Sequence, residues 1–108
     1  MARNIIDLPT LGDDGKLYRD TAVDMVESLI PNLWKSCHAP DLLELENGDL
    51  LCCWFAGSRE GNADISIAVA RLPADAEQWE QPVIVSDDPT RSEQNPSLFQ
   101  NPNGDIWL

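Results

Sequence analysis

The chain has 108 residues, of which 43% are hydrophobic and 24% charged, so its composition is that of a folded protein and its length allows one domain. The 19 Asp and Glu residues outnumber the 7 Lys and Arg residues and give a formal net charge of -12. This charge excludes nucleic acid and acidic membranes as partners, because an anionic polymer is repelled by most of the surface. A small anionic ligand can still bind where a few cations gather.

Three cysteines, Cys37, Cys52 and Cys53, are an odd number, and adjacent residues of a strand point to opposite faces, so we expect no disulfide framework. The first residues lack the apolar core of a secretory signal, and no run approaches the roughly 18 apolar residues of a membrane span. The sequence therefore predicts a cytoplasmic location.

Residues 1–35 have an irregular pattern and form an N-terminal extension in our division of the chain. The segment from Tyr18 to Ile30 is ambiguous. Val23, Val26 and Ile30 fit a helix, whereas Val23 and Met25 also permit a strand that ends before Pro31. Periodicity alone leaves both alternatives open.

From Pro40 onward the pattern is typical of β-structure. Leucines at 42, 43 and 45 precede Asn47-Gly48, a strong hairpin signal, and the apolar run 50–56 follows it. Alternating residues predict a third strand over 65–71, and residues 82–85 a short fourth one. Four antiparallel strands of this length are the size of one propeller blade, which we assign to residues 36–86.

The hairpin motif then recurs. The segment 40–50 is matched by 96–106 at an offset of 56 positions, with Pro, Leu, Asn, Gly and Asp identical. Such a period indicates a repeat architecture, since one sheet needs neighbours to cover both faces. Residues 87–108 are therefore the start of a second blade. The chain ends inside a predicted strand, so we expect a piece of a longer propeller that self-associates or pairs with the rest of it.

Several motifs together resemble the sialidase (neuraminidase) superfamily, and most closely the bacterial sialidase-like proteins with neuraminidase-type repeats. The match covers about residues 36–108, and the motifs that carry it are Ser36–Leu42, Asn47–Leu51, Trp54–Gly61, Asp64-Ile65, Trp79, Pro82-Val83 and Arg91–Pro96. The resemblance implies an all-β fold, a β-propeller commonly of six blades, with a glycan site at the centre of one face. It implies a glycan or small carbohydrate as the substrate and no cofactor.

The resemblance also implies roles for individual residues, with departures from the family pattern. The arginine of the family's Arg-Ile-Pro motif is replaced by His38, Arg59 stands where the second arginine belongs, and Asp64 is the nearest match to the acid/base aspartate. Sialidases use a Tyr nucleophile, but Tyr18, the single tyrosine, lies outside the matched region. The Asp-box, Ser-x-Asp-x-Gly-x-x-Trp, is reduced to Trp79, with Leu72, Ala74 and Ala76 at its other positions.

Each candidate has an alternative reading. Arg59 can grip a substrate carboxylate through a bidentate pair, or it can be a solvated charge paired with Glu60 or Asp64. Asp64 is either a general acid, which requires burial or a neighbouring carboxylate such as Glu60, or the cap of a turn. His38 is a sugar ligand, the base of a lyase that acts on uronic acids, or a structural residue.

Gln94 and Asn95, in the corresponding loop of the next blade, can bind sugar hydroxyls with Arg59 and Glu60, or can be ordinary turn residues before Pro96. The cysteine spacing fits no zinc site, so no metal is expected. Trp54, Phe55, Trp79 and Trp107 are predicted to lie in the core. The leading hypothesis is a sialidase-like glycan-processing enzyme of the exo-glycosidase class; the alternatives are a non-catalytic propeller that binds carbohydrate or protein, and a uronic-acid lyase.

Overall fold

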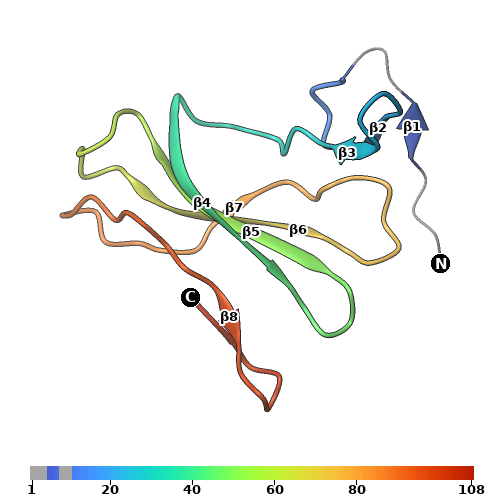
Figure 1. Cartoon of the computed structure of the whole chain (residues 1–108). Helices are drawn as coiled ribbons and strands as arrows, with labels where there is room; N and C mark the ends of the chain where they lie inside the picture. The colour runs from blue at the N-terminus through green and yellow to red at the C-terminus, as the bar shows by residue number, and fades with distance from the viewer. Residues whose placement is uncertain (1–4, 8–10) are drawn as a thin grey trace.

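The computed structural model describes residues 5–7 and 11–108, and all their regular elements are β-strands (Figure 1). In chain order these are β1 (Ile6–Asp7), β2 (Tyr18–Asp20), β3 (Met25–Glu27), β4 (Ser36–Glu44), β5 (Leu50–Gly57), β6 (Ser66–Leu72), β7 (Val83–Ile84), β8 (Phe99–Gln100) and β9 (Ile106–Trp107). The all-β prediction is confirmed. In this part of the chain no helix is long and apolar enough to cross a membrane.

The centre of the molecule is a four-stranded antiparallel sheet in the order β4-β5-β6-β7, as expected of a propeller blade. The hairpin predicted at Asn47-Gly48 joins β4 to β5. Gly48 has a φ of 89°, a left-handed conformation that costs glycine little, and Leu45 N donates to Asp49 O at 2.8 Å. Strand β5 is almost entirely buried, because it lies between two neighbours and both of its faces are covered.

Alternation along β5 separates two apolar clusters. We call one side the N-terminal face, which carries Leu17, Cys52, Trp54, Ala56, Ala68, Ala70, Leu72 and Trp79. We call the other the C-terminal face, which carries Leu45, Leu51, Cys53, Phe55, Ile65, Ile67 and Leu98. Each face is thus covered by a segment from outside the four-stranded sheet.

The N-terminal segment forms a small sheet in the order β1-β2-β3, with β1 parallel and β3 antiparallel to β2. The ambiguity over residues 18–30 is thereby resolved in favour of strands. Backbone hydrogen bonds tie the segment to the connection after β6, where Trp79 N donates to Gly15 O at 2.9 Å. Leu17 and Trp79 then pack together on the N-terminal face.

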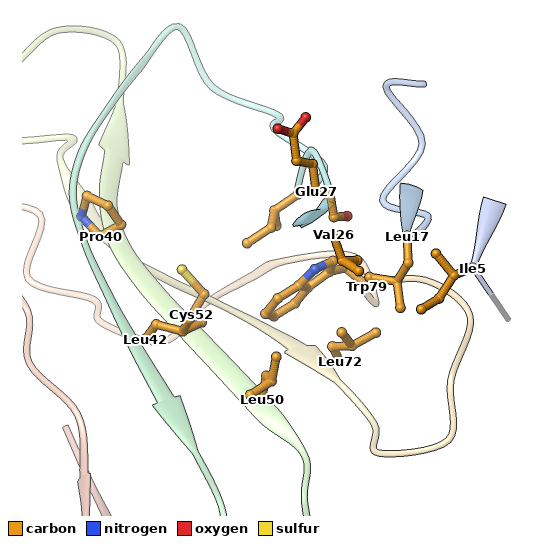
Figure 2. A pocket seen from close by; sticks show the side chains of 12 residues that line it. Ile5, Leu17, Val26, Glu27, Pro40, Leu42, Leu50, Cys52, Leu72 and Trp79 are labelled. Atoms are coloured by element: carbon orange, nitrogen blue, oxygen red, sulfur yellow. The ribbon is translucent and has the colours of Figure 1, made fainter. Parts of the chain in front are cut away.

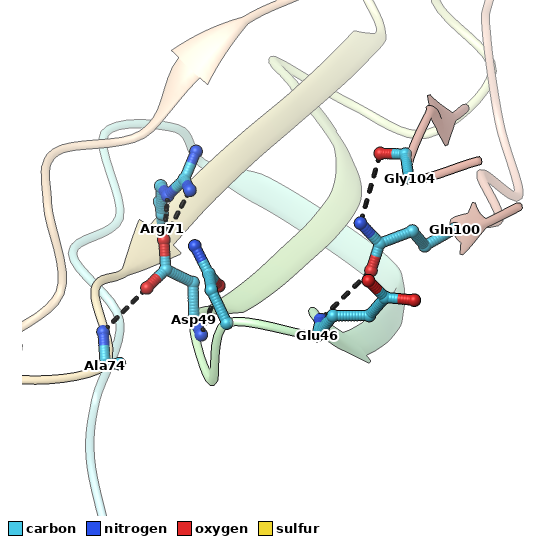
Figure 3. Close-up of polar contacts among 7 residues, drawn as sticks. Glu46, Asp49, Arg71, Ala74, Gln100 and Gly104 are labelled. Carbon is cyan, nitrogen blue, oxygen red and sulfur yellow. Dashed lines mark hydrogen bonds and ion pairs between the residues drawn. The ribbon is translucent and has the colours of Figure 1, made fainter. Parts of the chain in front are cut away.

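The second hairpin, β8–β9, repeats the first in detail. Asn101 N donates to Asp105 O at 2.9 Å, and Gly104 has a φ of 90°, nearly the value at Gly48. The hairpin docks beside the first one (Figure 3), where Gln100 Oε1 accepts a hydrogen bond from Glu46 N at 3.0 Å. The sequence repeat is therefore a structural repeat.

Of the four aromatic residues predicted for the core, Trp54, Phe55 and Trp79 are buried. The prediction for Trp107 is wrong, since 54% of its surface is exposed. Its ring stacks on that of Phe99 with the centroids 6.0 Å apart. The difference arises because β9 pairs with β8 and no other described strand lies beside it.

Asp49 ties the first hairpin turn to β6 and to the connection that follows it. Its buried carboxylate accepts hydrogen bonds from Arg71 Nε at 2.8 Å, from Arg71 Nη2, and from the backbone N of Ala74 at 2.8 Å (Figure 3). The Arg71 hydrogen bond is the main reason that the pKa of Asp49 is lowered. The first hairpin turn is thus fastened to the connection after β6 at the aspartate position of the degenerate box.

Candidate functional site

The predicted site residues gather at one end of the four-stranded sheet, which we call the loop end. It comprises the start of β4, the end of β5, the 58–65 loop and the 85–98 segment (Figure 1). Ser36 pairs with Gly57 there, so residues 32–35, which we call the strap before β4, lie beside the 58–65 loop. Glu93 N donates to Ile65 O at 3.0 Å and holds the 85–98 segment against that loop.

The 58–65 loop is folded tightly onto β5. Asn62 N donates to Arg59 O and Ile65 N donates to Asn62 O, both at 3.1 Å, so two successive turns shape the loop. A Cβ atom on Gly57 would lie 2.7 Å from Ile65 Cδ1 and 2.9 Å from Asp64 O. Only glycine therefore allows the loop to approach the end of β5 this closely. This approach fixes the positions of Arg59 and Asp64 relative to the sheet.

Arg59 is exposed at the tip of this loop and has no carboxylate within 4.0 Å among the described residues. The interpretation of Arg59 as a charge paired with Glu60 or Asp64 is therefore wrong. Ion pairs occur instead at Arg19, Arg71 and Arg91. Glu60, also exposed, makes none of these ion pairs.

Asp64 lies at a cavity of about 400 Å³ between the 58–65 loop and the strap before β4. The polar and aromatic groups that share this cavity are Trp34, Lys35 and Ser58. Trp34 and Lys35 were missed by sequence reasoning, which set residues 1–35 apart as an extension. An aromatic residue and a cation directly before the first matched motif are the signal that points to them.

Two local contacts position Trp34. Its backbone N donates to Asn32 Oδ1 at 2.9 Å, and its ring meets that of Trp54 edge-on, with the centroids 6.5 Å apart. Asn32 Oδ1 also accepts a hydrogen bond from Cys37 Sγ at 3.0 Å. Asn32 therefore fixes the strap as it enters β4.

His38 lies on β4, and its exposed imidazole stacks on Phe55 with the centroids 5.4 Å apart and the planes at 26°. The pairing of β4 with β5 shifts between His38 and Asp41, and Ala39 within this bulge has a φ of 54°. Bulges re-aim neighbouring side chains. His38 lines a cavity of about 220 Å³ with Cys37 and other residues, and it does not line the cavity of Asp64.

Gln94 and Asn95 line a third cavity, of about 590 Å³, at the same end of the sheet. Gln94 Nε2 donates to Ser92 Oγ at 2.8 Å, and Glu93 Oε1 accepts from Asp88 N at 2.9 Å. The repeat makes Gln94 the counterpart of His38. The structure thus brings the predicted residues to one end of the blade, but three separate cavities hold His38, Asp64 and the pair Gln94-Asn95.

Tyr18 begins β2, which lies away from this end of the four-stranded sheet (Figure 1), and its side chain is 7% exposed. Its hydroxyl donates to Asp14 Oδ2 at 2.9 Å, and burial is the main reason that its pKa is raised. The single tyrosine of the sequence is therefore buried and engaged with Asp14.

A further cavity of about 610 Å³ lies between the N-terminal segment and the N-terminal face (Figure 2). Apolar side chains such as Leu17, Leu72 and Trp79 form its walls, and Glu27 supplies its charged group. None of the predicted site residues lines it.

The three cysteines are free. Cys52 and Cys53 lie on opposite faces, as predicted, and burial raises the pKa of Cys52 to about 11. Within residues 5–7 and 11–108, no group of three or more His, Cys, Asp and Glu side chains is placed to hold a metal ion.

Comparison with known proteins complements this geometry. No curated protein and no solved structure matches the chain. The family model described as a BNR repeat-like domain matches residues 48–108, which is more than half of the chain and includes β5 to β9. The repeated hairpins and the four-stranded antiparallel blade agree with that match. The chain therefore belongs to the BNR repeat-like domain family.

Proposed function

We propose that this chain is the N-terminal part of a sialidase-like, glycan-processing propeller and that the loop end of its first blade binds the sugar. The observation that supports this most is the exposed Arg59, which has no carboxylate of the described residues within 4.0 Å although the chain has a net charge of -12. A guanidinium held by a tight loop is suited to bidentate binding of a carboxylate.

The proposed role of this blade is recognition. Arg59, Asp64, Gln94 and Asn95 offer donors and acceptors at one end of the sheet, whereas the single tyrosine is buried elsewhere. The nucleophile of an exo-glycosidase therefore has to be supplied by another chain or segment.

The test is a titration of the purified protein with sialosides, uronic-acid glycosides and neutral glycosides, followed by NMR chemical-shift changes. We expect binding, with shifts centred on the 58–65 loop, and a loss of roughly tenfold or more in affinity for Arg59→Ala, the scale of one charge-assisted contact. Arg19→Ala is the control, since it removes the same charge from β2. Absence of glycan binding, or equal effects of the two variants, would refute the proposal.

A non-catalytic binding propeller is the second candidate. It is favoured by the burial of Tyr18 and by His38 at the position of the family arginine. Product analysis distinguishes the candidates when the chain is combined with the segment that supplies the nucleophile: a hydrolase releases the free sugar, a lyase leaves a 4,5-unsaturated uronic acid unit on its product, and a binding protein returns the glycoside unchanged.

A further inference from the structure

The two hairpin turns share the sequence Asn-Gly-Asp, at residues 47–49 and 103–105. An asparagine followed by glycine is chemically labile, because glycine has no side chain to shield its backbone N from the amide of the asparagine. Gly48 and Gly104 have φ angles of 89° and 90°, and each glycine N donates to the backbone O three residues earlier, at 2.9 and 3.0 Å. The two turns therefore differ mainly in their surroundings.

Deamidation requires such a turn to open. The glycine N attacks the side-chain carbonyl carbon of the asparagine and must lose its hydrogen, which both turns hold in a backbone hydrogen bond. The rate in the folded protein therefore depends on the free energy of opening the turn locally. A turn with more contacts to break should react more slowly.

The first turn is held by its surroundings. Asn47 Oδ1 accepts a hydrogen bond from Asp49 N at 3.0 Å, and the Asp49 carboxylate is buried. Ala74 N donates to that carboxylate at 2.8 Å. A Cβ atom on Gly48 would lie 3.2 Å from Ala74 Cβ, so the connection after β6 packs against the turn. Opening this turn therefore breaks contacts both within it and outside it.

The second turn is open to solvent. Residues 102–105 are all exposed, and a Cβ atom on Gly104 would have no atom beyond its chain neighbours within 4 Å. Asp105 N donates to Asn101 Oδ1 at 2.8 Å and not to Asn103. Among the described residues, the side chain of Asn103 has no hydrogen-bond partner. This asparagine therefore lacks the restraints that Asn47 has.

We propose that Asn103 is a site of spontaneous deamidation and that the fold protects Asn47, which has the same two residues after it. In the reaction, Gly104 N loses its proton and attacks Asn103 Cγ, and the side-chain amide nitrogen leaves as ammonia. Water then opens the succinimide at either carbonyl, which gives aspartate or isoaspartate. Solvent water is the one co-reactant, and nothing is oxidised or reduced.

The modification should loosen the contact between the two hairpins. Isoaspartate adds a methylene group to the backbone of the turn between β8 and β9. Gln100 Nε2 donates to Gly104 O in that turn at 3.1 Å, and Gln100 Oε1 accepts from Glu46 N in the first hairpin (Figure 3). A displaced Gly104 therefore disturbs the residue that joins the hairpins.

The experiment incubates the purified protein at mildly alkaline pH, natively and in denaturant, and measures deamidation at each asparagine by mass spectrometry of its peptides. The native rate at each site is divided by its own rate in denaturant, which removes the effect of the preceding residue. We expect this ratio to be roughly five- to tenfold higher at Asn103 than at Asn47, the effect of about one further hydrogen bond to break. Asn103→Gln is the matched control, since ring closure through the longer side chain is slow.

Equal ratios at the two asparagines, or an Asn103 that stays intact in the native protein, would overturn the assignment. Hydrogen exchange of the incubated protein tests the consequence. Amides of β8 and β9 should exchange faster in incubated wild-type protein than in Asn103→Gln treated in the same way. Identical exchange, with Asn103 converted, would show that the modification leaves the contact between the hairpins intact.

Discussion

Asp41 and Ser97 occupy equivalent positions of the two repeats, and Ser97 Oγ donates a hydrogen bond to Asp41 Oδ2 at 3.2 Å across the 56 positions that separate them. The same oxygen accepts a hydrogen bond from Leu98 N at 2.7 Å. The second hairpin is therefore docked onto the first blade by a carboxylate that occurs only in the first copy. Its apolar partner in this contact is Leu98, buried on the C-terminal face.

Asp41→Ala should release this contact. Leu98 N would lose its acceptor, and we expect a lower urea midpoint and new amide exchange in β8 and β9, because a buried donor without a partner is costly. Asp13→Ala, which removes an exposed carboxylate of the N-terminal segment, is the control. Equal effects of the two substitutions would show that Asp41 contributes only charge.

Replacing Ala39 by asparagine should increase the stability of the folded protein. It has a φ of 54°, and Asn95, its counterpart in the second repeat, has a φ of 55°. Asparagine tolerates the left-handed region better than alanine. Ala39→Asn should therefore raise the free energy of unfolding by about 0.5–1 kcal/mol, a part of the left-handed penalty for alanine.

Urea unfolding measures this gain. Ala63→Asn, an exposed position outside the positive-φ residues, is expected to be neutral. A loss of stability in Ala39→Asn would mean that the methyl group of Ala39, which packs at the edge of the C-terminal cluster, matters more than the backbone.

Asp49→Asn should destabilise the blade more than Asp105→Asn does. Asp49 accepts bonds from Arg71 and Ala74, whereas Asp105, its counterpart in the second repeat, is exposed and accepts from Asn101 Nδ2 at 3.1 Å. The substitution leaves Arg71 without its carboxylate. Thermal unfolding of both variants provides the comparison, and an unchanged midpoint in Asp49→Asn would contradict this role.

Asp49 also makes the stability of the fold depend on pH in acid. The pKa of Asp49 is lowered, chiefly by Arg71, so its contribution to stability is complete above about pH 4, the usual aspartate range, and is lost as the pH falls through the lower value in the folded protein. Stability measured from pH 5 to pH 2 should therefore fall less steeply in Asp49→Asn than in the wild type. Parallel curves would exclude Asp49 as a source of the acid dependence.

The three thiols should react at different rates with a disulfide reagent such as Ellman's. Cys37 is half-buried, whereas Cys52 and Cys53 are buried and the pKa of Cys52 is raised to about 11. At pH 8 the native protein should therefore label first at Cys37, and all three thiols should react in denaturant. Cys37→Ser should abolish the first phase. Its persistence would mean that the sheet opens to expose β5.

Local signals were enough to predict much of the blade. Asn47-Gly48 specifies a tight hairpin wherever it is flanked by apolar runs, and the alternation in β6 specifies a strand, because turn geometry and side-chain period are properties of short segments. The recurrence of the motif at Asn103-Gly104 predicted a second hairpin of the same form. Arg59 and Asp64 were singled out from their place in that pattern and from family resemblance.

Only the tertiary structure decided which groups share a cavity and which charges are paired. The sequence left residues 18–30 open between helix and strand, missed Trp34 and Lys35, and placed Trp107 in the core. Each of these depends on contacts between separate segments. Trp34 contacts Trp54, the strap lies beside the 58–65 loop, and β9 pairs with β8 and with no other described strand. Local sequence determines strands and turns through backbone geometry, whereas burial and ligand geometry arise when separate segments meet, and that information is not local to any one of them.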